Sequence, residues 1–485
     1  MDTIGHTTPR RRASAMSKRV LKAVSIFGGL QVFTIICSIV RTKVVAVLIG
    51  PAGVGLLALY NSTMEMLQTN SQLNLRQSAV RDIAAASPSQ RPALIAATRR
   101  WALWLGLIGM ALVAICSPLL SRLTFGDGDH TIAFVALAVT MLLAAVTSGR
   151  LAELQALDKL SALAKASLWG AVAATVIALP LFYYLRLDAI IPVIITFTAC
   201  SFAAAMVMRY RGAVPTLTRQ RAISLGAPML KLGAYLTVSS GAALIGSYAF
   251  VVFLNRHAST DTLGIYQAGY TLVNTYVGVI FTSIAMEYYP RLSATIASAR
   301  RAAVLVRHEI VTLLWLLMPV IALFVAFDDV AVRLLYAESF MPLQPYVTIA
   351  IGGVLFRAVS WCLAFVILAR GDGRIYVCTE VASAVITLTL NIGGYMLWGF
   401  AGLGVAYVVD FALYTLITYA VYRRRYGMRL SRSIAALLLL GIGVAALSIV
   451  AKQLCGAWLT LLLTLPWLVP LAWRHIMRRR RVSRA

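Results

Sequence analysis

Long apolar runs are the feature that most constrains this chain. They recur from Val20 almost to the C-terminus, and each approaches the roughly 20 residues that a helix needs to cross a bilayer. Hydrophobic residues make up 60% of the 485 residues and charged residues only 13%, and the mean hydropathy is +0.83. A soluble domain requires a more polar surface than this composition supplies. The sequence therefore predicts an all-α integral membrane protein.

The spacing of the runs predicts about fourteen transmembrane helices, with boundaries uncertain by several residues. The predicted spans are 21–49, 53–78, 101–121, 131–150, 162–185, 189–208, 232–255, 263–287, 308–327, 343–369, 376–398, 401–422, 433–451 and 455–473. The connections between them are short, and the longest outer one runs over about residues 328–342. This pattern predicts that the protein acts within the membrane.

The spans divide into two predicted halves. The predicted organisation is a basic cytoplasmic tail at 1–20, a six-helix bundle at 21–210, a basic cytoplasmic linker at 211–231, a second six-helix bundle at 232–425, an extra transmembrane hairpin at 426–473 and a basic cytoplasmic tail at 474–485. A weak internal repeat supports this division. The segment that begins "VAVLIGPAGVGLLALYNS" can be laid over "VVFLNRHASTDTLGIYQAGY", with a polar turn between two spans in each. Parallel repeats of this kind are typical of transporters, which hold the substrate between the halves.

The charge distribution predicts the orientation in the membrane. Most of the 44 Lys and Arg residues gather in the two tails and in alternate connections, although the formal net charge of +27 would suggest a nucleic-acid partner in a soluble protein. Cytoplasmic connections of membrane proteins carry such an excess of basic residues. We therefore expect an even number of spans, both termini in the cytoplasm and no nucleic-acid partner.

Two cations lie in the second half of the first predicted span. Arg41 precedes Gly50 by about 13 Å of helix, which places it near mid-membrane, whereas Lys43 lies closer to the outer surface. Two helical residues rotate by about 200°, so only one of the two can line a given cavity. We expect that one to be Arg41, because Lys43 can extend its stem toward the interface.

The second predicted span is polar over its last half. It brings Glu65 close to the level of Arg41, where the two could form a structural pair, and it ends with Gln72, Asn74 and Arg76. Contact between such a polar face and lipid would be energetically unfavourable. We expect it to line a wet cavity that opens to the cytoplasm.

The second half offers its own candidates. Arg357 and Asp410 are predicted about 20 Å from the inner surface, where they could pair with each other or bind a ligand, and Arg256 is predicted at the outer mouth. Together with Arg41 and Arg76, the arginines Arg256 and Arg357 form a predicted cationic lining. Tyr270 belongs to a set of tyrosines that could stack on sugar rings, although aromatic stripes more often serve packing.

No motif in the sequence indicates an enzyme. The His residues lie in the tails or at the ends of spans, the Cys residues form no CxxC pair, and no P-loop or Ser–His–Asp order is present. We expect no catalytic residue, no metal and no cofactor. Transport would then depend on an ion gradient, the membrane potential or the gradient of the transported lipid.

Four motifs resemble those of Wzx-type polysaccharide-repeat flippases. These are "GPAGVG" after the first span, "AVRDIA" at the end of the second, "AKASLWGAVAATVIALPLFYYL" on the fifth and "LGIYQAGY" on the eighth. The resemblance extends over about residues 20–425 and places the chain in the multidrug/oligosaccharidyl-lipid/polysaccharide exporter superfamily, near the flippases for O-antigen and enterobacterial common antigen. Arg41 is similar in position to the first-helix Arg of related lipid-linked precursor flippases.

The resemblance implies a substrate and a location. It implies that the protein moves an undecaprenyl-diphosphate-linked oligosaccharide, such as an O-antigen or exopolysaccharide unit, from the cytoplasmic to the periplasmic leaflet of a bacterial inner membrane by alternating access. Membrane lipids, a polysaccharide polymerase and a chain-length regulator are the other partners that it suggests. Arginine suits the diphosphate, because its planar fork binds phosphate oxygens in pairs. The alternatives are a multidrug exporter of the same superfamily and a membrane enzyme of polysaccharide assembly.

Overall fold

The computed structural model describes residues 9–209, 212 and 214–482, and the described secondary structure is helical throughout. Nine of the described helices are long and apolar enough to cross a membrane, and α8 adds a tenth if its two parts, bent by 42°, count as one span. The predicted all-helical membrane protein is therefore confirmed. The side chains of both predicted basic tails, 1–20 and 474–485, lie outside this description.

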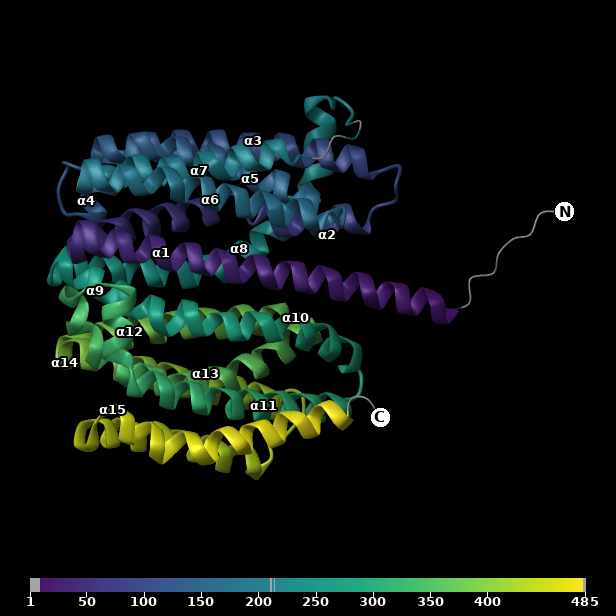
Figure 1. Cartoon of the computed structure of the whole chain (residues 1–485). Coiled ribbons are helices and arrows are strands. Elements are labelled where there is room, and N and C mark those ends of the chain that lie inside the picture. Colours follow the sequence, from purple (N-terminus) through teal and green to yellow (C-terminus); the bar gives the residue numbers. More distant parts are fainter. Residues whose placement is uncertain (1–8, 210–211, 213, 483–485) are drawn as a thin grey trace. The chain divides into compact units, whose positions relative to one another are not determined.

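The chain forms two compact units, which Figure 1 displays together. Unit 1 comprises residues 1–48 and 63–237, and unit 2 comprises residues 49–62 and 238–485. The long helices α1 and α8 each contribute residues to both units. The stretch predicted as a linker, 211–231, is helical from Arg219 onward, because α8 begins there and continues into the following span.

The helices of unit 1 follow one another with short connections. They are α1 (Pro9–Ser71), α2 (Leu75–Ala85), α3 (Arg91–Ile115), α4 (Ser117–Thr124), α5 (Thr131–Ala156), α6 (Leu160–Leu185), the short 3₁₀ turn η1 (Arg186–Ala189), α7 (Ile190–Val207) and α8 (Arg219–His257). Within the unit, α5 packs against both α3 and α7, and α6 packs against α7 (Figure 1). One core cluster of the unit joins Ile83 on α2, Ile95 on α3 and Met229 on α8.

Unit 2 contains the remaining helices. They are α9 (Thr260–Tyr270), the π-helical turn η2 (Thr271–Tyr276), α10 (Val277–Thr295), α11 (Ala299–Ala326), α12 (Asp328–Leu335), the 3₁₀ turn η3 (Glu338–Leu343), α13 (Gln344–Arg370), α14 (Gly373–Arg424) and α15 (Arg432–Val482). The apolar helix α11 forms the centre of this unit, because it packs against both α13 and α15 (Figure 1). Its residues Leu313, Leu314 and Leu317 are fully buried.

Three long helices contain sharp internal breaks. Non-helical backbone interrupts α1 at Gly50, α14 at Trp398 and Gly399, and α15 at Gly456. Gly50 and Gly456 have φ angles of 65° and 82°, a left-handed conformation that glycine adopts without the steric penalty of a side chain. Each break therefore lets the chain change direction between two apolar stretches without a long loop.

The structure corrects the second predicted span. Residues 53–78 were expected to form one helix, but α1 ends at Ser71 and α2 begins at Leu75. Leu73 and Asn74 between them have φ angles of 49° and 45°. Asparagine tolerates this left-handed conformation better than most residues, so it allows the chain to leave the helix here.

Two glycines in unit 2 permit a close helix crossing. A Cβ atom at Gly55 would lie 2.0 Å from the carbonyl oxygen of Thr260, and one at Gly264 would lie 1.9 Å from that of Pro51. The contact is reciprocal, since each glycine faces the carbonyl four residues before the other. Both glycines occupy matching places in the weak sequence repeat, at the start of the second span of each half.

Candidate functional site

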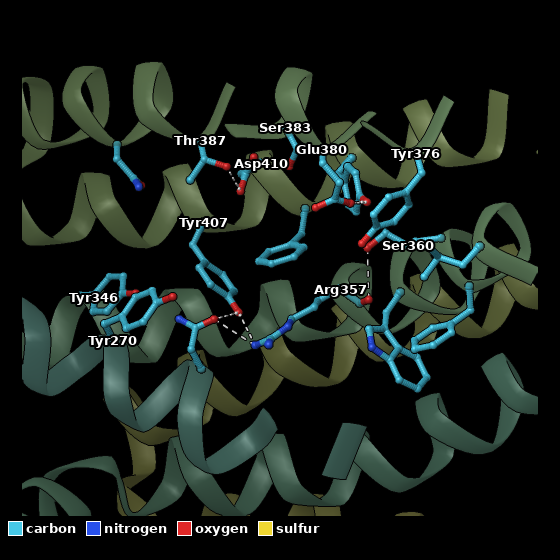
Figure 2. A pocket seen from close by; sticks show the side chains of 18 of the residues that line it. Tyr270, Tyr346, Arg357, Ser360, Tyr376, Glu380, Ser383, Thr387, Tyr407 and Asp410 are labelled. Atoms are coloured by element: carbon cyan, nitrogen blue, oxygen red, sulfur yellow. Dashed lines mark hydrogen bonds between the residues drawn. The ribbon is translucent and has the colours of Figure 1, made fainter. Parts of the chain in front are cut away.

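A polar cavity of about 430 Å³ lies within unit 2 (Figure 2). Its walls come from α9, η2, α13 and both parts of α14. The charged residues in the lining are Arg357, Glu380 and Asp410, and tyrosines surround them. Such a lining of aromatic rings around a few polar groups is typical of ligand sites.

Arg357 lies in the cavity wall and is held by uncharged groups. Its Nη1 donates hydrogen bonds to Asn274 Oδ1 at 3.0 Å and to the hydroxyl of Tyr407 at 3.4 Å, while that hydroxyl donates to Asn274 Oδ1 at 3.2 Å. Cζ of Arg357 lies 5.1 Å from the ring centre of Phe281 and 5.7 Å from that of Phe411. Within the described residues, Arg357 takes part in no ion pair, so its charge is not neutralised by a neighbouring carboxylate.

The local structure explains how Arg357 and Asn274 meet. Arg357 follows the apolar sequence "IAIGGVLF" on α13, so the burial of that helix carries the guanidinium deep into the unit. Asn274 lies in η2, where a π-helical turn interrupts the span between α9 and α10. Such turns occur often at functional sites, because they change the direction in which a side chain points.

Two carboxylates share the cavity with Arg357. Asp410 Oδ2 accepts a hydrogen bond from Thr387 Oγ1 at 2.9 Å, whereas Oδ1 is buried without a hydrogen-bond partner among the described residues. Glu380 accepts a hydrogen bond of 2.5 Å from the hydroxyl of Tyr414. The alternative that Arg357 and Asp410 pair with each other is therefore wrong within the described residues, since Arg357 bonds to Asn274 and Tyr407 and Asp410 bonds to Thr387 through one oxygen only. No group of three or more His, Cys, Asp or Glu within the described residues is placed to hold a metal ion.

Aromatic rings form much of the cavity wall. The ring centres of Tyr266 and Tyr346 lie 5.6 Å apart, and those of Tyr266 and Tyr270 lie 6.0 Å apart. Trp361 and Phe365 pack edge to face at 4.6 Å on the α13 side. Tyr270 is 38% exposed, which leaves part of its ring surface available for a ligand.

The sequence candidates of the second half are thus partly brought together. Arg357, Asp410 and Tyr270 line one cavity, as Figure 2 shows. Arg256 is exposed at the C-terminal end of α8 and is not among the residues that line this cavity. The role predicted for Arg256 in substrate binding remains a prediction.

Arg41 and Lys43 contact different helices of unit 1. Cζ of Arg41 lies 4.6 Å from the ring centre of Phe197 on α7, whereas Lys43 lies in an apolar groove beside Tyr183 and Tyr184 of α6. This divergence follows from the rotation of about 200° between the two positions. The predicted role of Arg41 in binding the substrate remains a prediction.

Glu65 does not pair with Arg41. Glu65 is exposed, and no ion pair between described residues involves it. The physical reason is that the Arg41 guanidinium lies over an aromatic ring, while the chain changes direction at Gly50 before it reaches Glu65. The predicted structural pair is therefore wrong.

The polar segment before α2 contacts other helices of unit 1. Asn74 Nδ2 lies 3.4 Å from Thr237 Oγ1 of α8, and Arg76 Nη2 lies 3.4 Å from Gln155 Oε1 of α5. Gln72 is half-buried in the turn between the helices. These contacts show that the polar side chains serve packing at least in part, and the wet cavity predicted beside them remains a prediction.

Several residues that line the cavity were not predicted from the sequence. Asn274 is an amide in an apolar stretch, four residues after Tyr270, and that spacing was a usable signal. Glu380 lies close to the basic boundary residue Arg374 and therefore resembles an interfacial charge. The sequence does not mark Thr387 or Tyr407 as cavity residues, because only the packing of the two parts of α14 brings them to the cavity.

Comparisons with solved structures show which known fold this chain shares. The chain is similar to an inward-facing multidrug resistance MATE family transporter of the MOP superfamily, with a TM-score of 0.68 and 11% identity over 83% of this chain and 95% of that one. It is also similar to lipid II flippase MurJ in an inward closed conformation, with a TM-score of 0.66 and 10% identity over 95% and 99% of the two chains. A MOP superfamily transporter from Pyrococcus furiosus, described by a binding pocket of reverse polarity, gives a TM-score of 0.53 and 11% identity over 86% and 94%. The fold is therefore that of a MOP-superfamily transporter.

The sequence itself identifies the family. The family described as "Polysaccharide biosynthesis protein" matches residues 20–296, which is more than half of the chain. The chain belongs to this family, and the resemblance noted in the sequence is confirmed. No curated protein sequence matches it. The chain is therefore a member of the polysaccharide biosynthesis family with the fold of MOP-superfamily transporters.

Proposed function

We propose that the protein is a flippase for an undecaprenyl-diphosphate-linked oligosaccharide, such as an O-antigen or exopolysaccharide repeat unit. Membership of the polysaccharide biosynthesis family supports a glycan substrate, and the likeness of the fold to a lipid II flippase supports a lipid-linked one. The observation that carries the proposal is the unneutralised guanidinium of Arg357 within a cavity of tyrosines.

The bonding of Arg357 leaves capacity for an anion. Only Nη1 has acceptors among the described residues, so Nε and Nη2 remain for a ligand. Guanidinium donors bind phosphate oxygens in pairs, and the interaction is strong where water is scarce. Tyr270 and the other rings of the cavity would contact the apolar faces of sugars. Arg41, Arg76 and Arg256 are the other arginines that we propose to contact the substrate, each considered within its own unit.

The proposed topology follows from the charge pattern and the helix breaks. Glycine-containing breaks in α1, α14 and α15, together with the turn η1 between α6 and α7, would divide the long helical segments into about fourteen spans. The reciprocal contact of Gly55 and Gly264 supports the proposed repeat of two six-helix bundles. We place the protein in a bacterial inner membrane with both termini in the cytoplasm, where a polymerase and a chain-length regulator would be its partners. A reporter fused after Arg221 and active only outside the cell would contradict this orientation.

Reconstituted vesicles test the substrate. A fluorescent undecaprenyl-diphosphate oligosaccharide in the outer leaflet becomes protected from a membrane-impermeant quencher when it is flipped. We expect transfer by the wild type and an at least tenfold slower rate for Arg357→Lys, which keeps the charge but loses the planar fork; tenfold corresponds to about 1.4 kcal/mol. Arg333→Lys is the control, since Arg333 is 61% exposed on α12 and lies outside the cavity.

A multidrug exporter is the second candidate, because Asp410 and Glu380 place two carboxylates in the same cavity. These groups would suit a cationic drug. The same vesicles, loaded with a fluorescent cationic dye, distinguish the two functions. Dye export that is equal in the wild type and in Arg357→Lys, without transfer of the glycolipid, would establish the exporter and reject the flippase.

A further inference from the structure

A basic pocket lies between α3 and α5 in unit 1, apart from the cavity described above. Its volume is about 260 Å³, and its lining combines Arg99, Arg100 and Arg150 with the apolar residues Leu103 and Val146. Phosphate groups and acyl chains together would match such a lining. We propose that this pocket binds the phosphate headgroup of an anionic membrane phospholipid.

The position of the pocket along its helices suits a lipid headgroup. After Arg100, α3 carries no charged residue to its end at Ile115, and α5 carries none from Thr131 up to Arg150. The pocket therefore lies where the uncharged stretches of both helices end, which is the level of the membrane interface. Trp101 and Trp104 lie at the same level, with their rings in edge-to-face contact at 5.1 Å. Tryptophan is enriched at this depth of a membrane.

One buried carboxylate organises the arginines. Glu153 is fully buried and accepts hydrogen bonds from Arg99 Nε at 2.7 Å and Arg99 Nη2 at 2.6 Å, and Arg150 Nη1 lies 3.4 Å from it. Arg100 Nη1 donates to the carbonyl oxygen of Leu217. Arg99 and Arg150 thus share one carboxylate, while a backbone carbonyl holds Arg100. The pocket lining itself contains three arginines and no acidic residue, so it is positively charged.

Arg150 has unused hydrogen-bonding capacity. Within the described part of the chain its only acceptor is Glu153, through Nη1, and its Nε is buried without a partner. Its side chain is 16% exposed, so it is held at the pocket and not free in solvent. A phosphate oxygen would supply the missing acceptor after a small rotation of the guanidinium, and the interaction would be charge-assisted.

The apolar side of the pocket continues along the helices. Leu103 and Leu107 on α3 are 43% and 40% exposed, and Val139 on α5 is 37% exposed. An acyl chain that leaves a phosphate at the arginines would lie against this surface. A free phosphate ion would gain nothing from it, so the geometry favours a phospholipid. A basic pocket between transmembrane helices is a recognised way to bind such headgroups.

Thermal unfolding of the detergent-purified protein tests the proposal. We expect phosphatidylglycerol to raise the melting temperature of the wild type more than phosphatidylcholine with the same acyl chains, because a ligand that binds only the folded protein stabilises it. The double variant Arg100→Gln/Arg150→Gln should lose at least half of this difference and keep its response to phosphatidylcholine. Arg81→Gln is the matched control, since Arg81 is 65% exposed on α2 and lies outside the pocket.

Three results would overturn the proposal. One is an equal effect of the two lipids on the wild type, and another is an unchanged phosphatidylglycerol effect in the double variant. The third is a rise with inorganic phosphate alone that equals the rise with phosphatidylglycerol, which would assign the pocket to a free anion. If the double variant does not fold, native mass spectrometry of Arg100→Gln decides the matter. A wild-type count of bound phosphatidylglycerol in this variant would contradict the proposal.

Discussion

Two buried aspartates in unit 2 have opposite environments. Asp328 is fully buried at the start of α12, where it accepts hydrogen bonds from Lys452 Nζ, from Gln344 Nε2 at 3.1 Å and from Thr348 Oγ1. Asp410 is 7% exposed in the cavity, with one oxygen bound to Thr387 and the other without a partner. The difference teaches that burial alone does not identify a functional charge, since a satisfied carboxylate stabilises the fold and an unsatisfied one remains ready for a ligand.

The satisfied aspartate connects three helices. Lys452 on α15 also reaches Asp329 at 3.2 Å, so α12, α13 and α15 meet at one cluster, which we call the anchor (Asp328, Asp329, Gln344, Thr348 and Lys452). Burial is the largest single influence on the pKa of Asp329 and raises it, but the hydrogen bond and charge of Lys452 together with backbone hydrogen bonds outweigh burial and leave the pKa lowered. The anchor gives the extra hairpin of the sequence a structural role, because it ties α15 to the rest of unit 2.

The largest effect should come from Lys452→Met. Removing the cation leaves the carboxylate of Asp328 buried without a counter-charge, which costs about 3–5 kcal/mol. The melting temperature in detergent and the amount of protein in the membrane should both fall sharply. Lys159→Met is a control, since Lys159 precedes α6 in unit 1 and lies outside the anchor. Equal stability of Lys452→Met and the wild type would remove the distinction between the two aspartates.

The next largest effect concerns the cavity and appears in transport. The double variant Arg357→Leu/Asp410→Leu leaves no lone buried charge of either sign, so we expect normal abundance in the membrane. Glycolipid transfer should remain absent, because the diphosphate has lost its guanidinium partner. Restored transfer in this variant would remove Arg357 from the substrate site. The measurement is vesicle transfer at matched protein levels.

A smaller effect is expected from Asp410→Asn. The amide keeps the size of the side chain and can still accept the hydrogen bond from Thr387, while the buried charge is lost. Stability should change by less than about 1 kcal/mol, in contrast to Lys452→Met. Thermal unfolding measures the difference. A loss as large as that of Lys452→Met would mean that Asp410 is as structural as Asp328.

The smallest effect is the pH dependence of the anchor. A carboxylate with a lowered folded-state pKa stabilises the fold above its unfolded pKa of about 4, and this contribution is lost as the pH falls through the folded pKa. Asp329 is 40% exposed, so solvent screening keeps its contribution small. The melting temperature of the wild type should therefore decline slightly more than that of Asp329→Asn below about pH 4. Parallel curves for the two proteins would exclude this role of Asp329.

The sequence predicted most of the fold features that depend on hydrophobicity, above all where the apolar spans end. Predicted spans end at 49, 398 and 451 and resume a few residues later, and the breaks of α1, α14 and α15 lie at or near these points. Glycine marks all three breaks, so composition and backbone freedom indicated the same places. The turn at 72–74 was missed, because a polar helix end and a polar turn have the same composition.

The site was predictable only where a charge lay deep in an apolar run. Arg357 and Asp410 were conspicuous for that reason, and both line the cavity. Their partners were not predictable, because Asn274, Tyr407 and Thr387 come from segments up to 133 positions apart along the chain, and packing alone decides which of them meet. Spacing suggested that Arg357 and Asp410 pair with each other, whereas the structure gives each a neutral partner.

The π-helical turn η2 makes the cavity sensitive to the length of the chain as well as to its composition. A turn with the wider i to i+5 spacing accommodates one residue more than an α-helical turn would. Deleting a single residue between Thr271 and Tyr276 would allow ordinary α-helical spacing, and the span would remain helical. The flanking helices α9 and α10 would keep about the same relative orientation, because the π turn holds its extra residue within a single turn, and the side chains inside the turn would change direction. Asn274 lies inside this turn, so one codon lost in frame would redirect the amide that holds Arg357 while Tyr270 on α9 keeps its place in the cavity wall.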